Sequence, residues 1–414
     1  MKKFELFCQR YGIALIPVCL ILAGCGLWPE MEMLVPSLPG MKRAFGIHDS
    51  HIQQLLTVNF VGFLLGVLVA GPLCDSVGRR KVFTGGAVVY LFSSLLSALA
   101  WNFPVLMAFR FLQGLSMTGP VIAGSVLLLE STYGAKQIFW MSLANSSITF
   151  CMAVAPIVGT WVNDLFGYQG NLWSILILGI VGISPTLFFV PESLEEEKKR
   201  PIQLALLVKG YISLLKDWRF MCLMLPITAL AAAYWIYVGI SALYMVDYLG
   251  LPAAHFGRYQ GPIVGCFSVI SLASGRLLVR FGLLKCVKFG ISLMSVGCTL
   301  LLGMSVLGLD HAICTTIFMM IFVGGMAPIC SVLFPQSVAH LPPELQGNAQ
   351  ALLNAMRLLF ASLGTFLLGF IYKGPLLPVS IMLFVIFVIS TWLLWKGRVF
   401  MKEVNTQVPL MGGH

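Results

Sequence analysis

Long apolar runs separated by short polar breaks constrain the fold of this chain more than any other feature of its sequence. A helix that crosses a bilayer needs about 20 consecutive apolar residues, and 58% of the 414 residues are hydrophobic while only 10% are charged. A soluble domain of this composition would expose large apolar patches to water. The sequence therefore predicts an all-α membrane protein with 12 transmembrane helices over 12–36, 52–74, 82–101, 104–129, 136–160, 172–190, 220–244, 257–278, 284–307, 311–336, 348–371 and 377–395.

The longest polar interruption divides these runs six from six. It begins with the charged run ESLEEEKKR at Glu192 and continues as an amphipathic stretch to Arg219. We interpret its charges as those of a solvated linker. The predicted organisation is an N-terminal six-helix bundle, a cytoplasmic linker, a C-terminal six-helix bundle and a cytoplasmic tail, over 1–191, 192–219, 220–395 and 396–414.

The distribution of basic residues predicts the orientation of the chain. If the N-terminus is inside, 20 of the 26 Lys and Arg residues fall in cytoplasmic segments, four in outside segments and two within helices. Cytoplasmic loops of membrane proteins carry an excess of Lys and Arg. Both termini are therefore expected in the cytoplasm, and the net charge of +10 indicates topology, with no nucleic-acid partner implied.

A charged turn lies between the second and third predicted helices. It reads GPLCDSVGRRK over 71–81 and resembles the loop G-x-x-x-D-R-x-G-R-R of the major facilitator superfamily, with Ser76 in place of the first arginine. The resemblance implies a conformational latch that breaks and re-forms on each transport cycle. Asp75 would cap a helix of the other half, and the arginines would hold nearby carboxylates. The expected latch residues are Gly71, Asp75, Gly78, Arg79, Arg80 and, at the inner end of the fourth helix, Glu130.

A weaker copy of this turn appears 204 positions later, over 275–285. It keeps both glycines and the final lysine and has lost the acid. A repeat at this spacing is what a duplicated six-helix unit predicts. Such halves are related by an axis along the membrane normal, with a substrate site between them near the midplane.

Few ionisable residues lie inside the predicted helices, and each costs at least about 2.5 to 3.5 kcal/mol there. The first helix carries Glu30 and Glu32, and the fourth carries Arg110. If the first helix ends near Leu38, Glu32 and Arg110 lie at the same depth, about 9 Å from the outer surface. We therefore expect Glu32 to pair with Arg110, while Glu30 lies about 200° around the helix.

The motifs around these residues favour proton coupling. The sequence EMLVPSLP over 32–39 resembles the pattern D-M-y-L-P-x-L-P of the bicyclomycin-resistance (Bcr/CflA) group of drug:proton antiporters, with Glu32 replacing the aspartate. RFLQG over 110–114 resembles the R-x-x-Q-G motif implicated in proton transfer. The resemblance implies a proton-coupling set of Glu32, Arg110 and Glu30. The alternatives are a Glu32 that snorkels to the outer interface and an Arg110 that serves packing only.

Three further stretches resemble the same superfamily. APIVGTW over 155–161 is similar to the antiporter motif ending G-P-x-x-G-G and keeps Pro156 and Gly159 but loses the flanking glycines, which leaves the direction of transport open. The alternative for Gly159 is ordinary helix packing. The stretches 242–257 and 347–351 resemble the turn after the seventh helix and the start of the eleventh.

Aromatic and amide side chains within the predicted helices are candidates for a central cavity. Such groups suit bulky amphipathic ligands through ring contacts and hydrogen bonds. Each of them could instead serve the core alone, and Arg357 could bind an anionic substrate, a carboxylate or a lipid headgroup. The candidates are Trp28, Asn59, Gln113, Asn145, Tyr234, Trp235, Tyr237 and Arg357.

These patterns together predict a monomeric, proton-coupled secondary transporter of the bacterial inner membrane. It would export amphipathic drugs or related small molecules by alternating access, with protons as the coupling ion and no other cofactor or metal. The alternatives are proton-coupled uptake, or export of one metabolite such as a siderophore. The sequence has no H-E-x-x-H, G-x-S-x-G or P-loop motif, so an intramembrane enzyme is not predicted. A non-transporting receptor is the remaining alternative.

Overall fold

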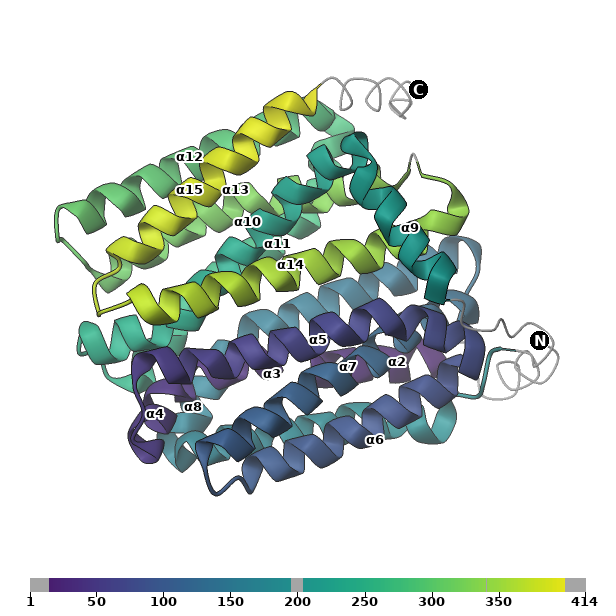
Figure 1. Cartoon of the computed structure of the whole chain (residues 1–414), viewed down its shortest axis with the longest axis horizontal. Helices are drawn as coiled ribbons and strands as arrows, with labels where there is room; N and C mark the ends of the chain where they lie inside the picture. The colour runs from purple at the N-terminus through teal and green to yellow at the C-terminus, as the bar shows by residue number, and fades with distance from the viewer. Residues whose placement is uncertain (1–14, 195–203, 340, 399–414) are drawn as a thin grey trace. The chain divides into compact units, whose positions relative to one another are not determined.

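The computed structural model describes residues 15–194, 204–339 and 341–398. Its helices form two units, residues 1–204 and 205–414, each with its own internal packing (Figure 1). The boundary between the units falls inside the stretch 192–219 that the sequence marks as a linker. No strand occurs in the described residues, which confirms the predicted all-α class.

The first unit contains a broken span followed by four long helices. Pro29 and Pro36 interrupt the first span, because proline lacks the N–H that the helical ladder needs. The helix nevertheless resumes after each break and continues to Phe45, beyond the end that the sequence predicts. The elements are α2 (Leu15–Leu27), α3 (Glu30–Leu34), the 3-10 turn η1 (Val35–Ser37), α4 (Leu38–Phe45), α5 (Asp49–Val77), α6 (Arg79–Ala98), α7 (Phe103–Ser131) and α8 (Gly134–Phe189).

Helix α8 crosses the membrane twice. Its 56 residues contain one non-helical position, Gly167 at φ 66° and ψ −170°. This left-handed φ is accessible to glycine at little cost, so the chain reverses there without a loop. The predicted break over 161–171 is therefore a single kinked position within helical residues. The two arms of α8 are the fifth and sixth predicted helices.

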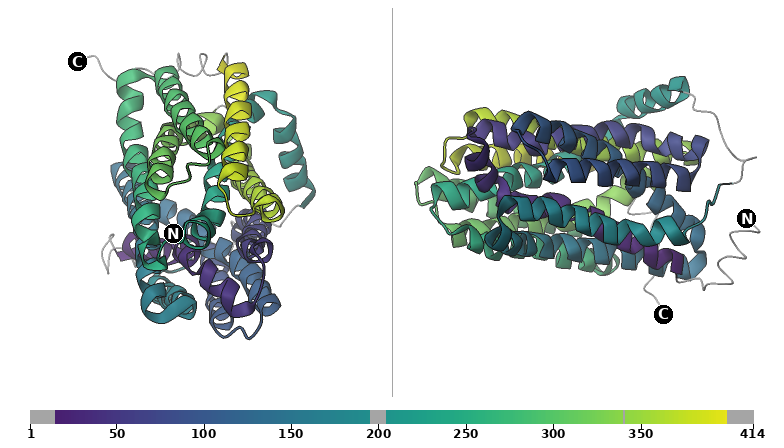
Figure 2. Two further views of the ribbon diagram at one scale, coloured as in Figure 1. Left: turned by 90° about the vertical axis from the view of Figure 1, so that its left-hand side faces the viewer. Right: turned by 90° about the horizontal axis from the view of Figure 1, so that it is seen from below.

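The second unit contains six long helices preceded by a short one. The short helix α9 lies outside the bundle that the long helices form (Figures 1 and 2). Helix α10 ends in a π-helical turn, η3, and α14 begins with Pro343 at its first position, where a missing N–H costs nothing. The elements are α9 (Leu204–Lys216), α10 (Trp218–Ala242), η3 (Leu243–Tyr248), the 3-10 turn η4 (Ala253–His255), α11 (Phe256–Phe281), α12 (Leu283–Val306), α13 (Ala312–Ala339), α14 (Pro343–Ile371) and α15 (Leu377–Lys396).

Eleven helical stretches in the described residues are long and apolar enough to span a membrane. One of them, Phe139–Phe189, has 51 residues and contains the Gly167 reversal, so it accounts for two crossings. The structure therefore confirms the predicted fold of 12 membrane-spanning helices.

The two copies of the charged turn adopt the same local structure. Gly78 ends α5 with φ 121°, and Gly282 ends α11 with φ 77°. Each glycine N–H donates to the carbonyl four residues earlier, Cys74 at 3.2 Å and Leu278 at 2.8 Å. These two hydrogen bonds are 204 positions apart, as are the motif copies. The repeat in the sequence thus corresponds to a repeated helix-turn-helix in the structure.

Candidate functional site

The first unit contains a buried ion pair at the level of the membrane-spanning helices. Glu30 of α3 is 2% exposed and Arg110 of α7 is 1% exposed. The Nη1 atom of Arg110 lies 3.4 Å from Oε1 of Glu30. A buried pair of this kind costs several kcal/mol of desolvation per ion unless other hydrogen bonds help to offset it.

Two further side chains donate to the same carboxylate. Tyr90 of α6 donates its hydroxyl to Oε2 of Glu30 at 2.6 Å, and Asn59 of α5 donates its amide to Oε1 at 2.9 Å. Tyr90 and Asn59 are themselves buried, at 0% and 2% exposure. Donors from three different helices therefore converge on one carboxylate, and we call these four residues the Glu30 cluster.

A second layer of hydrogen bonds orients the cluster. Gln113, one turn after Arg110, donates to the Ser94 hydroxyl at 2.7 Å, and Ser94 donates to the carbonyl of Tyr90 at 2.7 Å. Gln113 is 1% exposed, so the predicted motif residues Arg110 and Gln113 both point into the protein. Arg110 contacts the carboxylate directly, whereas Gln113 reaches the helix that carries Tyr90.

Two glycines bring the backbones of this site close together. A Cβ at Gly114 would collide with the backbone of Asn59, and a Cβ at Gly159 would collide with the backbone of Met33. Small residues allow such close helix approach in membranes. Gly114 thereby lets α5 present Asn59 to Glu30, and Gly159 fits α8 against the short helix that carries both glutamates.

The expected pairing of Glu32 with Arg110 is wrong, because Glu30 is the partner of Arg110. The prediction measured depth from a helix end near Leu38, but the helix continues to Phe45. The span is also broken at Pro29 and by the 3-10 turn Val35–Ser37, so a count of residues from Leu38 did not give the depth of either glutamate. Glu32 is fully buried at 0% exposure, so the alternative in which it snorkels to the outer interface is also wrong.

A second group of polar side chains lies around Ser37 of the first span. Asn171, in the second arm of α8, donates to Ser37 at 2.6 Å and to the carbonyl of Gly159 at 2.8 Å. Ser37 in turn donates to Asn163 of the first arm at 3.0 Å. Ser37 and Asn171 are both 0% exposed. This network ties the first span to both arms of α8 on either side of the Gly167 reversal.

The charged turn at the opposite end of α5 forms ion pairs. Nη2 of Arg79 lies 3.4 Å from Asp75 and 3.0 Å from Oε1 of Glu130. The expected contact between Glu130 and an arginine of the turn is therefore present. The carboxylate of Asp75 is 60% exposed, and its role as a cap for a helix of the other half stays a prediction.

Glu192 completes this turn. Its Oε1 accepts from the backbone N–H of Arg80 at 3.3 Å, at the positive N-terminal end of α6. Gly78 leaves the room for this carboxylate, because a Cβ there would collide with it. The guanidinium of Arg80, expected to hold a carboxylate, donates instead to the carbonyl of Leu187 at 3.1 Å.

The comparisons with known proteins agree with this architecture. The family model described as Major Facilitator Superfamily matches residues 20–365. The chain belongs to the Major Facilitator Superfamily. The superfamily was expected from the charged turn, and the match covers most of both units.

Two curated relatives and one solved structure are similar to this chain over most of their length. The uncharacterized MFS-type transporter YdgK of Bacillus subtilis is 27% identical over 87% of this chain and 90% of its own. A bicyclomycin resistance protein homolog of Haemophilus influenzae is 21% identical over 79% of this chain and 82% of its own. The xylose transporter XylE from E. coli shares the fold, with a TM-score of 0.72, 13% identity and coverage of 93% and 97%.

The predicted cavity residues of this superfamily member differ in their surroundings. Asn59 and Gln113 belong to the buried polar network described above. Trp28 is half-buried with its ring 6.0 Å from Phe63, and Asn145 is exposed within its unit. These four positions lie in the first unit, and the other four predicted positions lie in the second unit.

In the second unit, Tyr234 accepts a hydrogen bond from Gln260 at 3.3 Å, and its ring lies 5.6 Å from that of half-buried Trp235. Tyr237 is 0% exposed. Arg357 of α14 is half-buried, and its Nε atom has no hydrogen-bond partner in the described residues.

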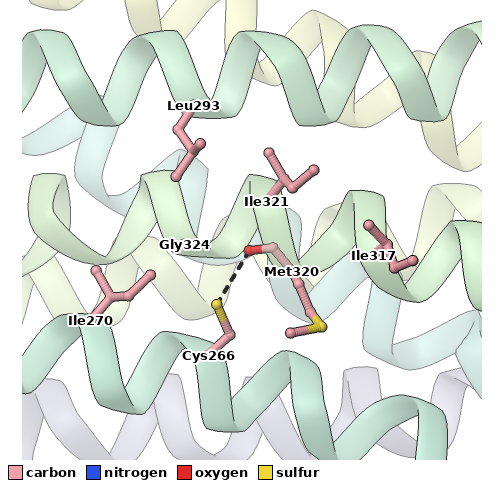
Figure 3. A pocket seen from close by; sticks show the side chains of 7 residues that line it. All are labelled: Cys266, Ile270, Leu293, Ile317, Met320, Ile321 and Gly324. Carbon is pink, nitrogen blue, oxygen red and sulfur yellow. Dashed lines mark hydrogen bonds between the residues drawn. The ribbon is translucent and has the colours of Figure 1, made fainter.

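The second unit also has an apolar groove of about 290 Å³ among α11, α12 and α13. Figure 3 shows Cys266, whose thiol donates to the carbonyl of Met320 at 3.5 Å, on one wall. The residues that line this groove carry no charged side chain. Its lining is Cys266, Ile270, Leu293, Ile317, Met320, Ile321 and Gly324.

Sequence reasoning missed three residues of these sites. Tyr90 stood in a helix without charges, although the serines at 93, 94 and 97 around it indicated a polar face. Glu192 was assigned to a solvated linker, and the proline before it was the signal of a defined turn. Asn171 lay in a predicted loop, and nothing in the sequence showed that it would face Ser37.

Proposed function

We propose that this superfamily member is a proton-coupled antiporter of the bacterial inner membrane that exports amphipathic small molecules by alternating access. The observation that carries the proposal is the buried ion pair of Glu30 and Arg110, with Tyr90 and Asn59 on the same carboxylate. Ionisable groups at membrane depth are costly and mark ion or proton pathways.

The geometry supports Glu30 as the site of proton binding. A proton on Glu30 removes the negative charge that attracts Arg110, so proton binding and the position of Arg110 are linked. Arg110 remains charged under all physiological conditions and must then find another partner. If a conformational change brings this new partner to Arg110, binding of the proton to Glu30 is coupled to transport. Glu32, two residues away and fully buried, is the second candidate for the same proton.

The substrate class rests on the relatives and on the side chains of the helices. One relative is named for bicyclomycin resistance. The aromatic and amide groups Trp28, Tyr234, Trp235, Tyr237 and Asn145 remain candidates for contacts with an amphipathic ligand, and Arg357 is a candidate for an anionic group. The excess of Lys and Arg in alternate loops supports an orientation with both termini in the cytoplasm.

The turn around Asp75 would act as the latch of this cycle. Arg79 holds both Asp75 and Glu130, and Glu192 covers the N-terminus of α6. Pro156 and Gly159 would support the outer part of the pathway, because Gly159 fits α8 against α3. These contacts can break without unfolding a helix, which a latch requires.

The first experiment measures the collapse of a pH gradient in everted vesicles that contain the protein. Lipophilic cations, neutral antibiotics and siderophore-like acids are added in turn to wild type, Glu30→Gln and Glu32→Gln. We expect one substrate class to release protons with the wild type, and Glu30→Gln to abolish this release while it still binds that substrate. Asp164→Asn, a substitution of an exposed acid in α8, is the matched control and should behave as wild type.

The other outcomes separate the alternatives. Loss of coupling in Glu32→Gln alone would move the proton site to Glu32. Movement of protons and substrate together out of the everted vesicles would indicate uptake, because the exterior of such a vesicle corresponds to the cytoplasm. Proton release with the siderophore-like acids alone would indicate one metabolite class. A wild-type protein that binds ligands without proton movement would refute the transporter mechanism and favour a receptor.

A further inference from the structure

Helix α9 has two apolar faces, of which only one is used inside the protein. On the inner face, Leu214 is 1% exposed and packs with Phe220, Met224 and Leu352. Gly210 lies so close to Asn348 of α14 that a Cβ would collide with its side chain. The inner face therefore fixes α9 to α10 and α14.

The outer face presents a stripe of exposed aliphatic side chains. Val208, Ile212 and Leu215 are 52%, 46% and 46% exposed. Their spacing of four and three residues places them on one side of a helix. A stripe of this kind on a short helix outside the membrane spans would be unfavourable in water.

Two cations lie along one edge of this stripe. Lys209 and Lys216 are both exposed and lie about 80° to 100° around the helix from Val208, on the same edge. An apolar stripe with lysines along its edge is typical of helices that lie in the membrane interface. The negative charge that would complement these lysines is that of anionic lipid headgroups.

The connection to α10 holds α9 at the bilayer surface. Only Asp217 separates Lys216 at the end of α9 from Trp218 at the start of α10. Asp217 caps α10 by accepting from the N–H groups of Arg219 at 2.9 Å and Phe220 at 3.3 Å. Trp218 is 56% exposed, and tryptophan is enriched at the membrane–water interface. The stripe therefore ends next to the residue at which a membrane span begins.

We propose that α9 is an interfacial helix whose outer stripe of Val208, Ile212 and Leu215 inserts into the headgroup region, with Lys209 and Lys216 on anionic lipids. The surface charge of the bilayer then stabilises α9, and through its inner face the start of α10 and α14. This inference does not depend on the identity of the substrate or on proton coupling.

Hydrogen–deuterium exchange of the full chain in nanodiscs tests this proposal. The discs contain phosphatidylcholine alone or with about one third phosphatidylglycerol. Two lysines near an anionic surface contribute enough binding energy that we expect amides of α9 to exchange at least about tenfold more slowly in the anionic discs. About 0.5 M salt should reduce this difference, because it screens the lysines.

Variants identify the residues responsible. Lys209→Ser with Lys216→Ser should remove the dependence on phosphatidylglycerol, and Ile212→Ser should speed exchange in both kinds of disc. Lys285→Ser with Lys288→Ser, which changes two exposed lysines of α12, is the matched control and should keep the wild-type difference. Unchanged exchange of α13 peptides, in a helix that the proposal does not involve, shows that a variant is folded.

Two results would overturn the proposal. Equal exchange of α9 in neutral and anionic discs would show that lipid charge does not bind it, and a protein partner or a second copy would then be the occupant of the stripe. An effect of the α12 control as large as that of the α9 variant would show a general charge effect.

Discussion

At the scale of single residues, the Glu30 carboxylate receives donors from three helices and lies beside one cation. Hydrogen bonds to charged groups contribute about 1.5–3 kcal/mol each. Contributions of this size are large enough to decide the pH at which the carboxylate accepts a proton. Tyr90 is the most buried of the three donors and makes the shortest bond, 2.6 Å. It is a positioning residue for Glu30.

We expect Tyr90→Phe to move the pH profile of transport toward higher pH by about one unit or more. The variant loses a donor that favours the ionised carboxylate, while its ring still fills the same space. The initial rate of substrate-driven proton release, measured across pH, checks this. Tyr244→Phe, in the second unit, is the control. Tyr244 is 0% exposed and shares a hydrogen bond of 3.2 Å with Thr315 of the same unit. An unshifted profile with only a lower rate would show that Tyr90 serves stability alone.

At the scale of elements, one acid connects two loops of the second unit, the one between α12 and α13 and the one before α15. Asp310, between α12 and α13, accepts from the N–H of Leu376 at 3.2 Å, where α15 begins. Burial raises the pKa of Asp310 above its ordinary value of 3.8, although the bond to Leu376 opposes this. A raised pKa of an acid means that the folded state favours the protonated form. Its ionisation therefore lowers stability as the pH rises through the raised pKa.

Asp310→Asn should increase stability at neutral and alkaline pH, where the native carboxyl is ionised. The amide oxygen can still accept from Leu376, and no charge has to be buried. We expect the midpoint of thermal unfolding in detergent to rise by about 1–3 °C near pH 8, and the gain to shrink toward pH 4. A gain that is equal at both pH values, or a loss at pH 8, would contradict the role of ionisation.

At the scale of the whole molecule, the repeat places two equivalent turns in the two units. Gly78 and Gly282 have the same backbone role, but only the first turn carries the acid Asp75 and the ion pairs of Arg79. The duplicated fold is therefore electrostatically asymmetric.

Asp75→Asn should slow turnover about tenfold while it changes substrate affinity less than twofold, because Asp75 lies about 24 Å along α5 from Asn59 of the Glu30 cluster. Transport rates in vesicles and equilibrium binding in detergent separate the two effects. Asp49→Asn, which breaks the ion pair of Asp49 with Lys42, is the control and should leave turnover near wild type. Normal turnover with weaker binding would refute the latch.

The amino-acid sequence by itself determined the class of protein, the number of spans and the duplication. Each follows from local properties: the length of apolar runs, the positions of charges and a repeated motif. The same locality indicated Arg110 and Gln113 as residues of one motif within the fourth helix and Glu130 as a partner of the charged turn. These predictions needed no knowledge of which helices are neighbours.

Only the tertiary structure decided which glutamate contacts Arg110. Pro29 and Pro36 break the first span but do not end it, so depth could not be counted from the sequence. The roles of Tyr90, Asn59 and Glu192 also depend on helices that are distant in the chain, and on Gly114 and Gly78 for the room that brings them together. Contacts between distant segments are set by packing, and a spacing along one helix carries no information about its neighbour.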